Sequence, residues 1–168
     1  MGSKTMFVFP EEKDFFLKHL NKKQNVLEWG SGSSTAVIAE KVKSVVSIEH
    51  NKEWYDIVSK NLPSNAKLHF VSPKYQHDWR VDGDGSPDNF EKYIFYPVEL
   101  GDKYDLIFID GRARVQCASV CSKISKEDTM IFVHDFSDER ISEGYDEMYK
   151  YLELIERVRS MALFKLKS

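Results

Sequence analysis

A short glycine-containing stretch near the N-terminus has the residue types of a nucleoside-binding loop. It reads Glu28-Trp29-Gly30-Ser31-Gly32-Ser33-Ser34-Thr35 and follows the apolar pair Val26-Leu27. Two glycines at i and i+2 between a strand and a helix let the backbone turn tightly and approach a ligand closely. A dinucleotide fingerprint would place a third glycine or an alanine at Thr35. The Glu28 carboxylate repels a pyrophosphate and suits an ammonium group, so the loop favours a cationic amino-acid ligand over a dinucleotide.

A second acid is placed to bind the sugar of the same ligand. Glu49 ends an apolar segment and lies 49 − 32 = 17 residues after Gly32. A carboxylate at the end of a second strand can accept hydrogen bonds from both hydroxyls of a ribose. Folds that bind nicotinamide and folds that bind S-adenosylmethionine share an acid here. Glu49 therefore predicts a nucleoside without identifying which one.

Three further polar residues end two other apolar segments. Asp110 follows residues 106–109, and His134 and Asp135 follow residues 129–133. A hydroxyl acceptor needs a base or a metal ion, because its own pKa lies far above neutrality. Asp110, His134 and Asp135 are therefore the candidate catalytic residues, with Asp110 or His134 as a base that needs no metal.

The same acids allow two other interpretations. Asp110 and Asp135 are candidate ligands for Mg²⁺ or Ca²⁺, since both ions prefer carboxylate oxygens. Alternatively, they only cap helices and pair with Arg112 or Arg114.

The elements that must position these residues alternate between helix and strand. Because the most apolar strands are uninterrupted runs, they indicate an α/β fold with a parallel sheet covered on both faces. Ligands of such sheets bind beyond the carboxyl ends of the strands, where the candidate residues lie. Helices are expected over residues 10–20, 33–42, 54–62, 115–124 and 142–151, and strands over 26–29, 45–49, 67–72, 104–110 and 129–133. A closing hairpin of 152–158 and 161–166 follows, although propensity alone would extend the last helix to Arg157.

Residues 73–103 interrupt this alternation and predict a long aromatic and acidic loop. A loop of this length inside a domain is usually functional or mobile. Its aromatic rings and carboxylates suit a sugar or another polyol, although packing of the rings onto the sheet is an equal alternative. Asp82-Gly83-Asp84 has the alternating acids of a calcium loop. Pro87 and Tyr93 stand where that loop needs glycine and glutamate, so the match fails.

Composition restricts the class of protein. The 168 residues are 42% apolar and 30% charged, which predicts one globular domain. A net charge of −3 without a basic block argues against duplex nucleic acid or an anionic membrane as a partner. Cys117 and Cys121 fit neither a disulfide framework nor a metal knuckle, so a reducing, cytoplasmic compartment is expected.

The motifs resemble a known family. Residues 27–35 together with Ser47-Ile48-Glu49 are similar to the cofactor half of class I S-adenosylmethionine-dependent methyltransferases. Residues 108–118, which contain Ile-Asp-Gly-Arg, and residues 133–136 resemble a small methyltransferase-like subgroup with relatives near glycan-building enzymes. The resemblance extends over residues 10–166. It implies a Rossmann-like three-layer αβα sandwich whose mostly parallel seven-stranded sheet has an antiparallel last strand.

The resemblance also implies roles for single residues and S-adenosylmethionine as the cofactor. Metal-dependent relatives usually have Asn or Asp after the second acid, and Phe136 stands here, so a metal is not favoured. The implied cofactor contacts are Gly30, Ser31 and Gly32 at the methionine portion, Glu28 at its amino group, Ser34 and Thr35 at its carboxylate, Glu49 at the ribose, His50 at the ribose or adenine, and Asp78 and Trp79 at the adenine.

These observations predict a single methyltransferase domain over residues 1–168 that O-methylates a sugar hydroxyl in a glycan or another small polar acceptor. The sequence is also compatible with a domain cut from a larger glycan-assembly enzyme. A non-catalytic module that binds the nucleoside is the main alternative. An NAD-binding domain is the weaker alternative, because Thr35 replaces the third glycine and no second catalytic domain is evident.

Overall fold

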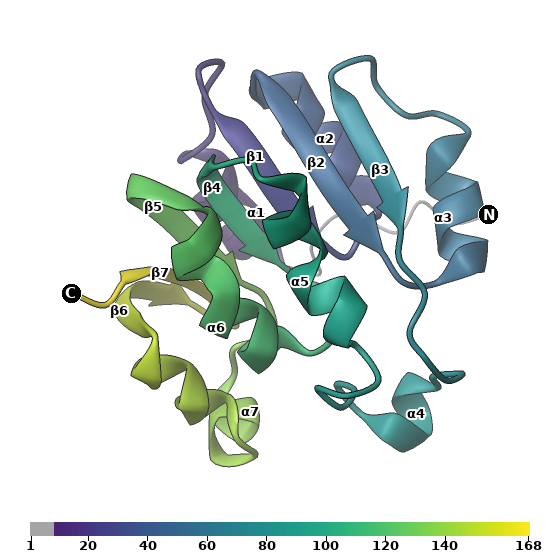
Figure 1. Cartoon of the computed structure of the whole chain (residues 1–168). Coiled ribbons are helices and arrows are strands. Elements are labelled where there is room, and N and C mark those ends of the chain that lie inside the picture. Colours follow the sequence, from purple (N-terminus) through teal and green to yellow (C-terminus); the bar gives the residue numbers. More distant parts are fainter. Residues whose placement is uncertain (1–8) are drawn as a thin grey trace.

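The computed structural model describes residues 9–168, so the first eight residues of the expected domain lie outside the description. Seven strands form one sheet in the order β3-β2-β1-β4-β5-β7-β6 (Figure 1). Neighbouring strands among β1 to β5 are parallel, and β7 runs antiparallel to both β5 and β6. This confirms the expected Rossmann-like fold. The strands are β1 (Asn25–Trp29), β2 (Ser44–Glu49), β3 (Ala66–Phe70), β4 (Tyr104–Ile109), β5 (Ser125–Val133), β6 (Leu152–Val158) and β7 (Met161–Leu166).

Both faces of the sheet are covered by helices. Leu27 and Trp29 of β1 pack with α5 and α6, whereas Val26 packs with α1 and α2 on the opposite face. Successive strand residues point to opposite faces, so a strand buried on both faces is mainly apolar, and the buried polar residues, here Glu28 and Ser47, hydrogen-bond to each other. The helices are α1 (Pro10–Leu17), α2 (Ser33–Lys41), α3 (Lys52–Ser59), α4 (Trp79–Asp82), α5 (Glu91–Leu100), α6 (Arg114–Ile124) and α7 (Asp138–Ser142), with the 3₁₀ helix η1 (Tyr145–Lys150).

The expectation of a continuous loop over residues 73–103 is wrong, because α4 and α5 form within it. Tyr93, Ile94 and Pro97 are the buried face of α5. Pro97 has no N–H to donate to the carbonyl of Tyr93 one turn earlier. The indole N–H of Trp29 donates to that carbonyl instead, at 3.1 Å. A tertiary hydrogen bond thus compensates for the proline that interrupts the helical pattern.

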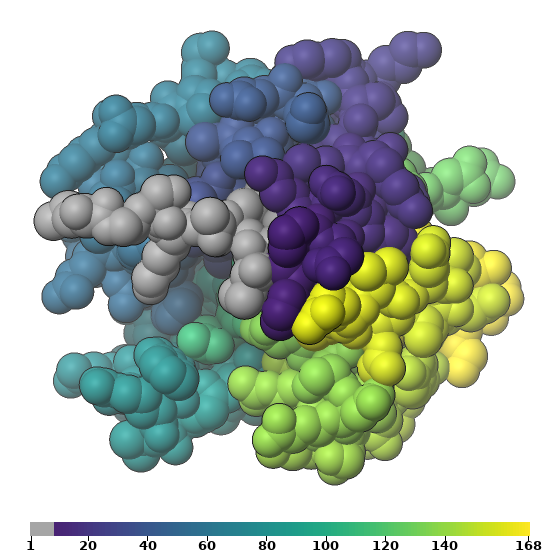
Figure 2. All heavy atoms as spheres, turned by 180° about the vertical axis from the view of Figure 1, so that it is seen from behind, coloured from purple at the N-terminus to yellow at the C-terminus, as the bar shows by residue number. Residues whose placement is uncertain are grey.

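The other differences lie at element ends. The expected helix over 142–151 is replaced by the 3₁₀ helix η1, and α7, which the sequence does not predict, ends at Ser142 before Gly144, whose φ is 125°. β5 begins at Ser125 rather than at residue 129. The closing hairpin forms as expected and lies beside α1 (Figure 2). No helix in the described part of the chain is long and apolar enough to cross a membrane.

Candidate functional site

A cleft of about 360 Å³ opens at the carboxyl ends of β1, β2 and β4. A second cleft of about 640 Å³ adjoins it and is built mainly from the segment after β3, including Asp78. His50 and Trp79 line both. The residues predicted from the sequence that line the first cleft are Gly30, Ser31, Glu49, His50, Trp79 and Asp110. The lining residues that no sequence motif suggests as cofactor contacts are Asn51, Glu53, Trp54, Ile57, His77, Gly111 and Arg112.

The two glycines of the loop differ in what they require. Gly30 has a φ of +93°, and a Cβ there would lie 2.6 Å from the Cα of Gly111. Gly32 has an extended φ of 174°, and a Cβ there would meet Trp54 at an ordinary 3.5 Å. The end of β1 therefore touches the chain after β4 only because both Gly30 and Gly111 lack side chains.

Glu49 is buried at the end of β2 and holds the loop in place. One of its carboxylate oxygens accepts hydrogen bonds from Ser31, from the N–H at 3.0 Å and the hydroxyl at 2.7 Å. The other accepts from the N–H groups of His50 at 2.9 Å and Asn51 at 2.8 Å. Burial raises the pKa of Glu49, and these hydrogen bonds partly oppose the rise. A ribose would therefore have to share this carboxylate with the loop.

Glu28 lies beneath the loop and has no exposed surface. Its carboxylate accepts hydrogen bonds from the hydroxyls of Ser34, of Thr35 at 2.6 Å and of Ser47 at 2.7 Å. Burial raises its pKa to about 7, although the three hydroxyl groups oppose the rise. Glu28, Ser34 and Thr35 thus join β1, β2 and α2 to one another. The structure does not bring these three predicted cofactor contacts into the cleft.

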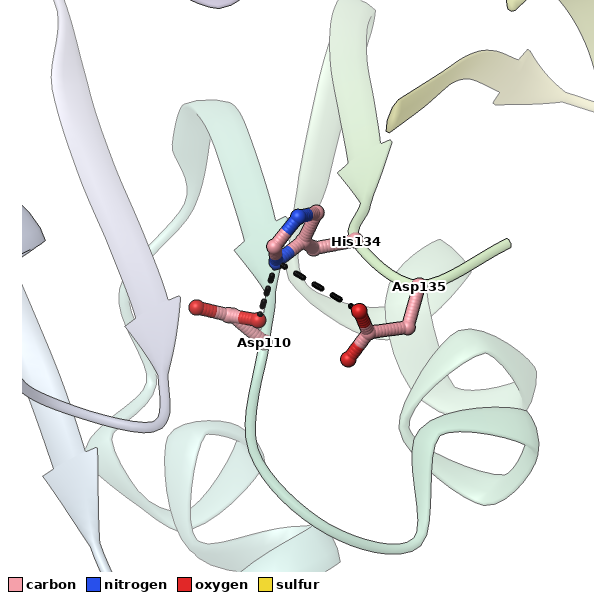
Figure 3. Close-up of side chains that lie close together, drawn as sticks. All are labelled: Asp110, His134 and Asp135. Carbon is pink, nitrogen blue, oxygen red and sulfur yellow. Dashed lines mark hydrogen bonds and ion pairs between the residues drawn. The ribbon is translucent and has the colours of Figure 1, made fainter. Parts of the chain in front are cut away.

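Asp110, His134 and Asp135 lie together at the ends of β4 and β5 (Figure 3). His134 Nδ1 is 2.9 Å from Asp110 Oδ1 and 4.0 Å from Asp135 Oδ1. The second oxygen of Asp110 points away from His134 (Figure 3), and Asp110 alone of the three lines the cleft described above. Asp110 is therefore the member of this group best placed to touch a molecule in the cleft.

The other ring nitrogen of His134 faces a carboxylate from outside the sequence motifs of the site. His134 Nε2 lies 3.3 Å from Oε2 of Glu12, a fully buried residue of α1. The other oxygen of Glu12 accepts hydrogen bonds from Ser160 in the closing hairpin, from N–H at 2.9 Å and from the hydroxyl at 2.7 Å. Glu12 therefore connects the first helix and the hairpin to the site.

Because both ring nitrogens face carboxylate oxygens, the doubly protonated ring satisfies both contacts, whereas a neutral ring leaves one nitrogen lone pair against an oxygen. Burial lowers the pKa of His134, but the hydrogen bond and charge of Asp110 and the charge of Asp135 outweigh it and leave the pKa raised. His134 is thus arranged to hold Asp110 rather than to offer a free base nitrogen.

Arg114, at the start of α6, adds a permanently charged guanidinium to this acid cluster. Its Nη1 lies 2.9 Å from Asp135 Oδ2, and its Nη2 lies 3.8 Å from Asp110 Oδ1. It also donates hydrogen bonds to the carbonyls of His134 and, at 3.0 Å, Gly111. Burial lowers the pKa of Arg114, but the surrounding acids outweigh it and raise the pKa.

Asp110, His134 and Asp135 each offer one ligand atom within 4.8 Å of the others, close enough to share a metal ion, but these atoms already have partners in the structure. Asp110 and Asp135 share the buried guanidinium of Arg114, and the nearest nitrogen of His134 is directed at Asp110. A second cation would have to displace these contacts and would be repelled by the guanidinium. The pairing of both acids with an arginine, one of the alternatives expected from the sequence, is present in the structure, with Arg114 as that arginine.

Asp84 connects the segment between α4 and α5 to the same cluster. Its carboxylate accepts a hydrogen bond from the N–H of Arg114 at 2.9 Å, and its carbonyl accepts one from Ala113 at 2.6 Å. Ala113 has a left-handed φ of 51°, so the start of α6 is strained and needs this anchor. Asp84 is thus part of the cap of α6. Nothing local in the sequence links Asp84 to a residue 30 positions later.

Solved structures with the same fold include methyltransferases of several kinds, a precorrin decarboxylase and a protein of unknown function. A methyltransferase-like protein from Silicibacter pomeroyi is 22% identical, with a TM-score of 0.69 over 96% of this chain and 88% of that one. The tRNA (m1A58) methyltransferase TrmI of Aquifex aeolicus is 19% identical, with a TM-score of 0.64 over 100% of this chain and 73% of that one. The N-methyltransferase NodS of Bradyrhizobium japonicum, in complex with S-adenosylhomocysteine, is 14% identical, with a TM-score of 0.64 over 98% of this chain and 90% of that one.

These similarities establish the fold of S-adenosylmethionine-dependent methyltransferases. No protein-family model matches the sequence, and no curated protein matches it. One of these proteins methylates tRNA and another is an N-methyltransferase, and one fold hosts many functions, so the acceptor must be argued from the site.

Proposed function

We propose that this protein is an S-adenosylmethionine-dependent methyltransferase that O-methylates a small polar acceptor, with a sugar hydroxyl of a glycan as the leading candidate. The observation that carries the proposal is the cleft in which the Gly30 turn and Glu49 lie beside Asp110. The turn lets the backbone approach the donor, and Glu49 offers a carboxylate to its ribose. Trp54 and Trp79 supply the flat apolar surfaces that an adenine ring needs.

When bound, the sulfonium donor supplies an already activated methyl group. The protein's task is then to align donor and acceptor, which contributes up to about 7–11 kcal/mol in well-oriented reactions. Asp110 accepts the proton of the acceptor hydroxyl through the oxygen that points away from His134 (Figure 3), and His134 holds the other oxygen. Asp110 is the catalytic residue in this scheme. His134 and Arg114 are positioning residues, and no step requires a metal ion.

The proposed acceptor and location follow from charge and from the cysteines. The net charge of −3 gives no support for a nucleic-acid acceptor. Cys117 and Cys121 are free and buried, which fits a cytoplasmic protein.

Calorimetric titration with S-adenosylhomocysteine tests the donor site, with NAD as the control ligand and with Mg²⁺ present and absent. We expect micromolar binding of S-adenosylhomocysteine, no binding of NAD, and the same affinity in both magnesium conditions. If S-adenosylhomocysteine does not bind, the proposed function fails and only the assignment of the fold stands. Good affinity without transfer to any acceptor would favour the non-catalytic module.

Replacing Asp110 with asparagine is expected to separate binding from catalysis. Asparagine keeps the size of the side chain but cannot accept the proton, so methyl transfer to a panel of saccharides should fall by about 10²–10⁴-fold. Binding of S-adenosylhomocysteine should stay within about threefold, a change of under 1 kcal/mol. Asp128→Asn, at an exposed site before the apolar part of β5, is the matched control and should leave both unchanged. Full turnover by the Asp110 variant would remove Asp110 from the catalytic role.

A further inference from the structure

Arg112 is a cation of the cleft to which the proposed reaction assigns no task. It lines the cleft with Gly30, Ser31 and Asp110, and no other lysine or arginine lines it among the described residues. Its position follows from Gly111, whose backbone packs on the Gly30 turn. Arg112 therefore lies at the loop over which the methionine portion of the donor is expected.

The guanidinium of Arg112 makes no ion pair or hydrogen bond with any residue of the described chain. Arg114, two positions later, is buried and paired with acids. Arg80, in the adjoining cleft, is paired with Asp78 at 2.8 Å. Within residues 9–168, Arg112 is thus a cleft arginine whose five N–H donors are available to a ligand.

The other basic groups of the cleft do not carry this charge. Burial, with the charge of Arg112 as the next cause, lowers the pKa of His50 to about 4. The same two causes lower the pKa of His77. Both rings are therefore neutral at physiological pH, and the positive charge of the cleft resides on Arg112.

The structure also leaves the donor's carboxylate without the partners that the sequence suggests for it. The hydroxyls of Ser34 and Thr35 donate to Glu28 beneath the loop. The N–H of Gly32, at the start of α2, donates to the hydroxyl of Thr35 at 3.1 Å. A carboxylate lying over this loop would meet few free donors from α2. An arginine is the side chain best suited to replace them, because its planar fork matches a carboxylate.

We infer that Arg112 binds the carboxylate of the methionine portion of S-adenosylmethionine and so makes this site selective for a donor that carries an intact amino-acid end. The inference rests on the proposed function. It assigns Arg112 to the donor rather than to an anionic group of the acceptor.

Three ligands test it by calorimetry: S-adenosylhomocysteine, its carboxamide, and 5′-methylthioadenosine, which lacks the amino-acid end. A charge-assisted hydrogen bond contributes about 1.5–3 kcal/mol, so the wild-type protein should bind S-adenosylhomocysteine about 10- to 100-fold more tightly than the carboxamide. In Arg112→Met this ratio should fall to about one, because no charge distinguishes the two ligands. Affinity for 5′-methylthioadenosine should be the same in both proteins, and Arg112→Lys should restore part of the ratio.

Arg80→Met is the matched control, since it removes a paired arginine from the adjoining cleft. Its ratio should equal that of the wild type. If Arg112→Met keeps the wild-type ratio of affinities for S-adenosylhomocysteine and its carboxamide, the inference is overturned. Arg112 would then be a candidate to bind an anionic group of the acceptor. Weaker binding of 5′-methylthioadenosine by Arg112→Met would also overturn the inference, by showing an effect on the nucleoside or the fold. If the wild type binds none of the three ligands, the proposed function itself fails.

Discussion

Replacing Gly30 with alanine should unfold the donor site, whereas the same change at Gly32 should be tolerated. The new Cβ at Gly30 would lie 2.6 Å from the Cα and 2.7 Å from the nitrogen of Gly111. Backbone cannot yield as a flexible side chain does. The positive φ adds strain of about 1–3 kcal/mol, and overpacking adds about 1–3 kcal/mol more. We therefore expect Gly30→Ala to lower the free energy of unfolding by about 2–6 kcal/mol.

Gly30→Ala should weaken binding of S-adenosylhomocysteine as well as lower the stability of the fold. Relief of the clash must move the end of β1 away from the chain after β4, and this displaces the turn that approaches the donor. Affinity for S-adenosylhomocysteine should fall by about 100-fold or more, the equivalent of about 2.8 kcal/mol. Gly32→Ala is the matched control, because its Cβ would meet only the Trp54 ring at an ordinary distance.

Urea unfolding and calorimetric titration of both variants provide the measurement. Equal effects at the two positions would show that the motif acts through the ligand rather than through the contact between Gly30 and Gly111. A Gly30→Ala protein with wild-type stability would contradict the geometry of that contact.

Replacing Arg114 with methionine should produce the second large loss. Arg114 is nearly fully buried and offsets the charges of Asp110, Asp135 and Asp84. Methionine has a similar length but removes the guanidinium, so that only Asp110 and Asp135 keep a basic neighbour, the ring of His134. Removal of one partner from a buried ion pair typically costs about 3–5 kcal/mol. Because 20–47% of the side-chain surface of the three acids is exposed, water offsets part of this cost, and the free energy of unfolding at pH 7 should fall by about 2–4 kcal/mol.

Arg112→Met is the internal control for this prediction. It removes the same side chain two positions earlier, from a guanidinium with no ion pair in the described chain, and should change stability by under about 0.5 kcal/mol. Arg114→Lys should recover only part of the loss, since an ammonium group cannot reach both acids and the carbonyls in the geometry of the fork. A loss below about 1 kcal/mol in Arg114→Met would mean that water or rearranged side chains stabilise the acids.

The sequence by itself predicts the architecture and the edge of the sheet at which the site forms. Gly30, Glu49 and Asp110 could be assigned to strand ends because short, mainly apolar segments stop just before them. The closing hairpin is less determined by the sequence, since propensity alone would extend the preceding helix to Arg157, and the structure decides for the hairpin. The assignments of strand ends succeed because a change from apolar to polar or glycine residues reports where a buried strand leaves the core, which is a local property of the chain.

The sequence is less informative where a helix depends on a distant partner. Pro97 within residues 73–103 favours a loop, and α5 forms because Trp29, 64 positions away, donates to the carbonyl that the proline leaves without a partner. Local propensity could not show this hydrogen bond.

The tertiary structure alone decided which polar side chains face the cleft and which pair with one another. Glu28, Ser34 and Thr35 satisfy each other beneath the loop, although their spacing suits contacts with a ligand equally well. Glu12 reaches His134 across 122 positions of the chain. A buried polar group must find a partner, and its partner is whichever group the folded chain brings within about 3 Å. The sequence therefore determines the residues available at the site, whereas the path of the chain determines their roles.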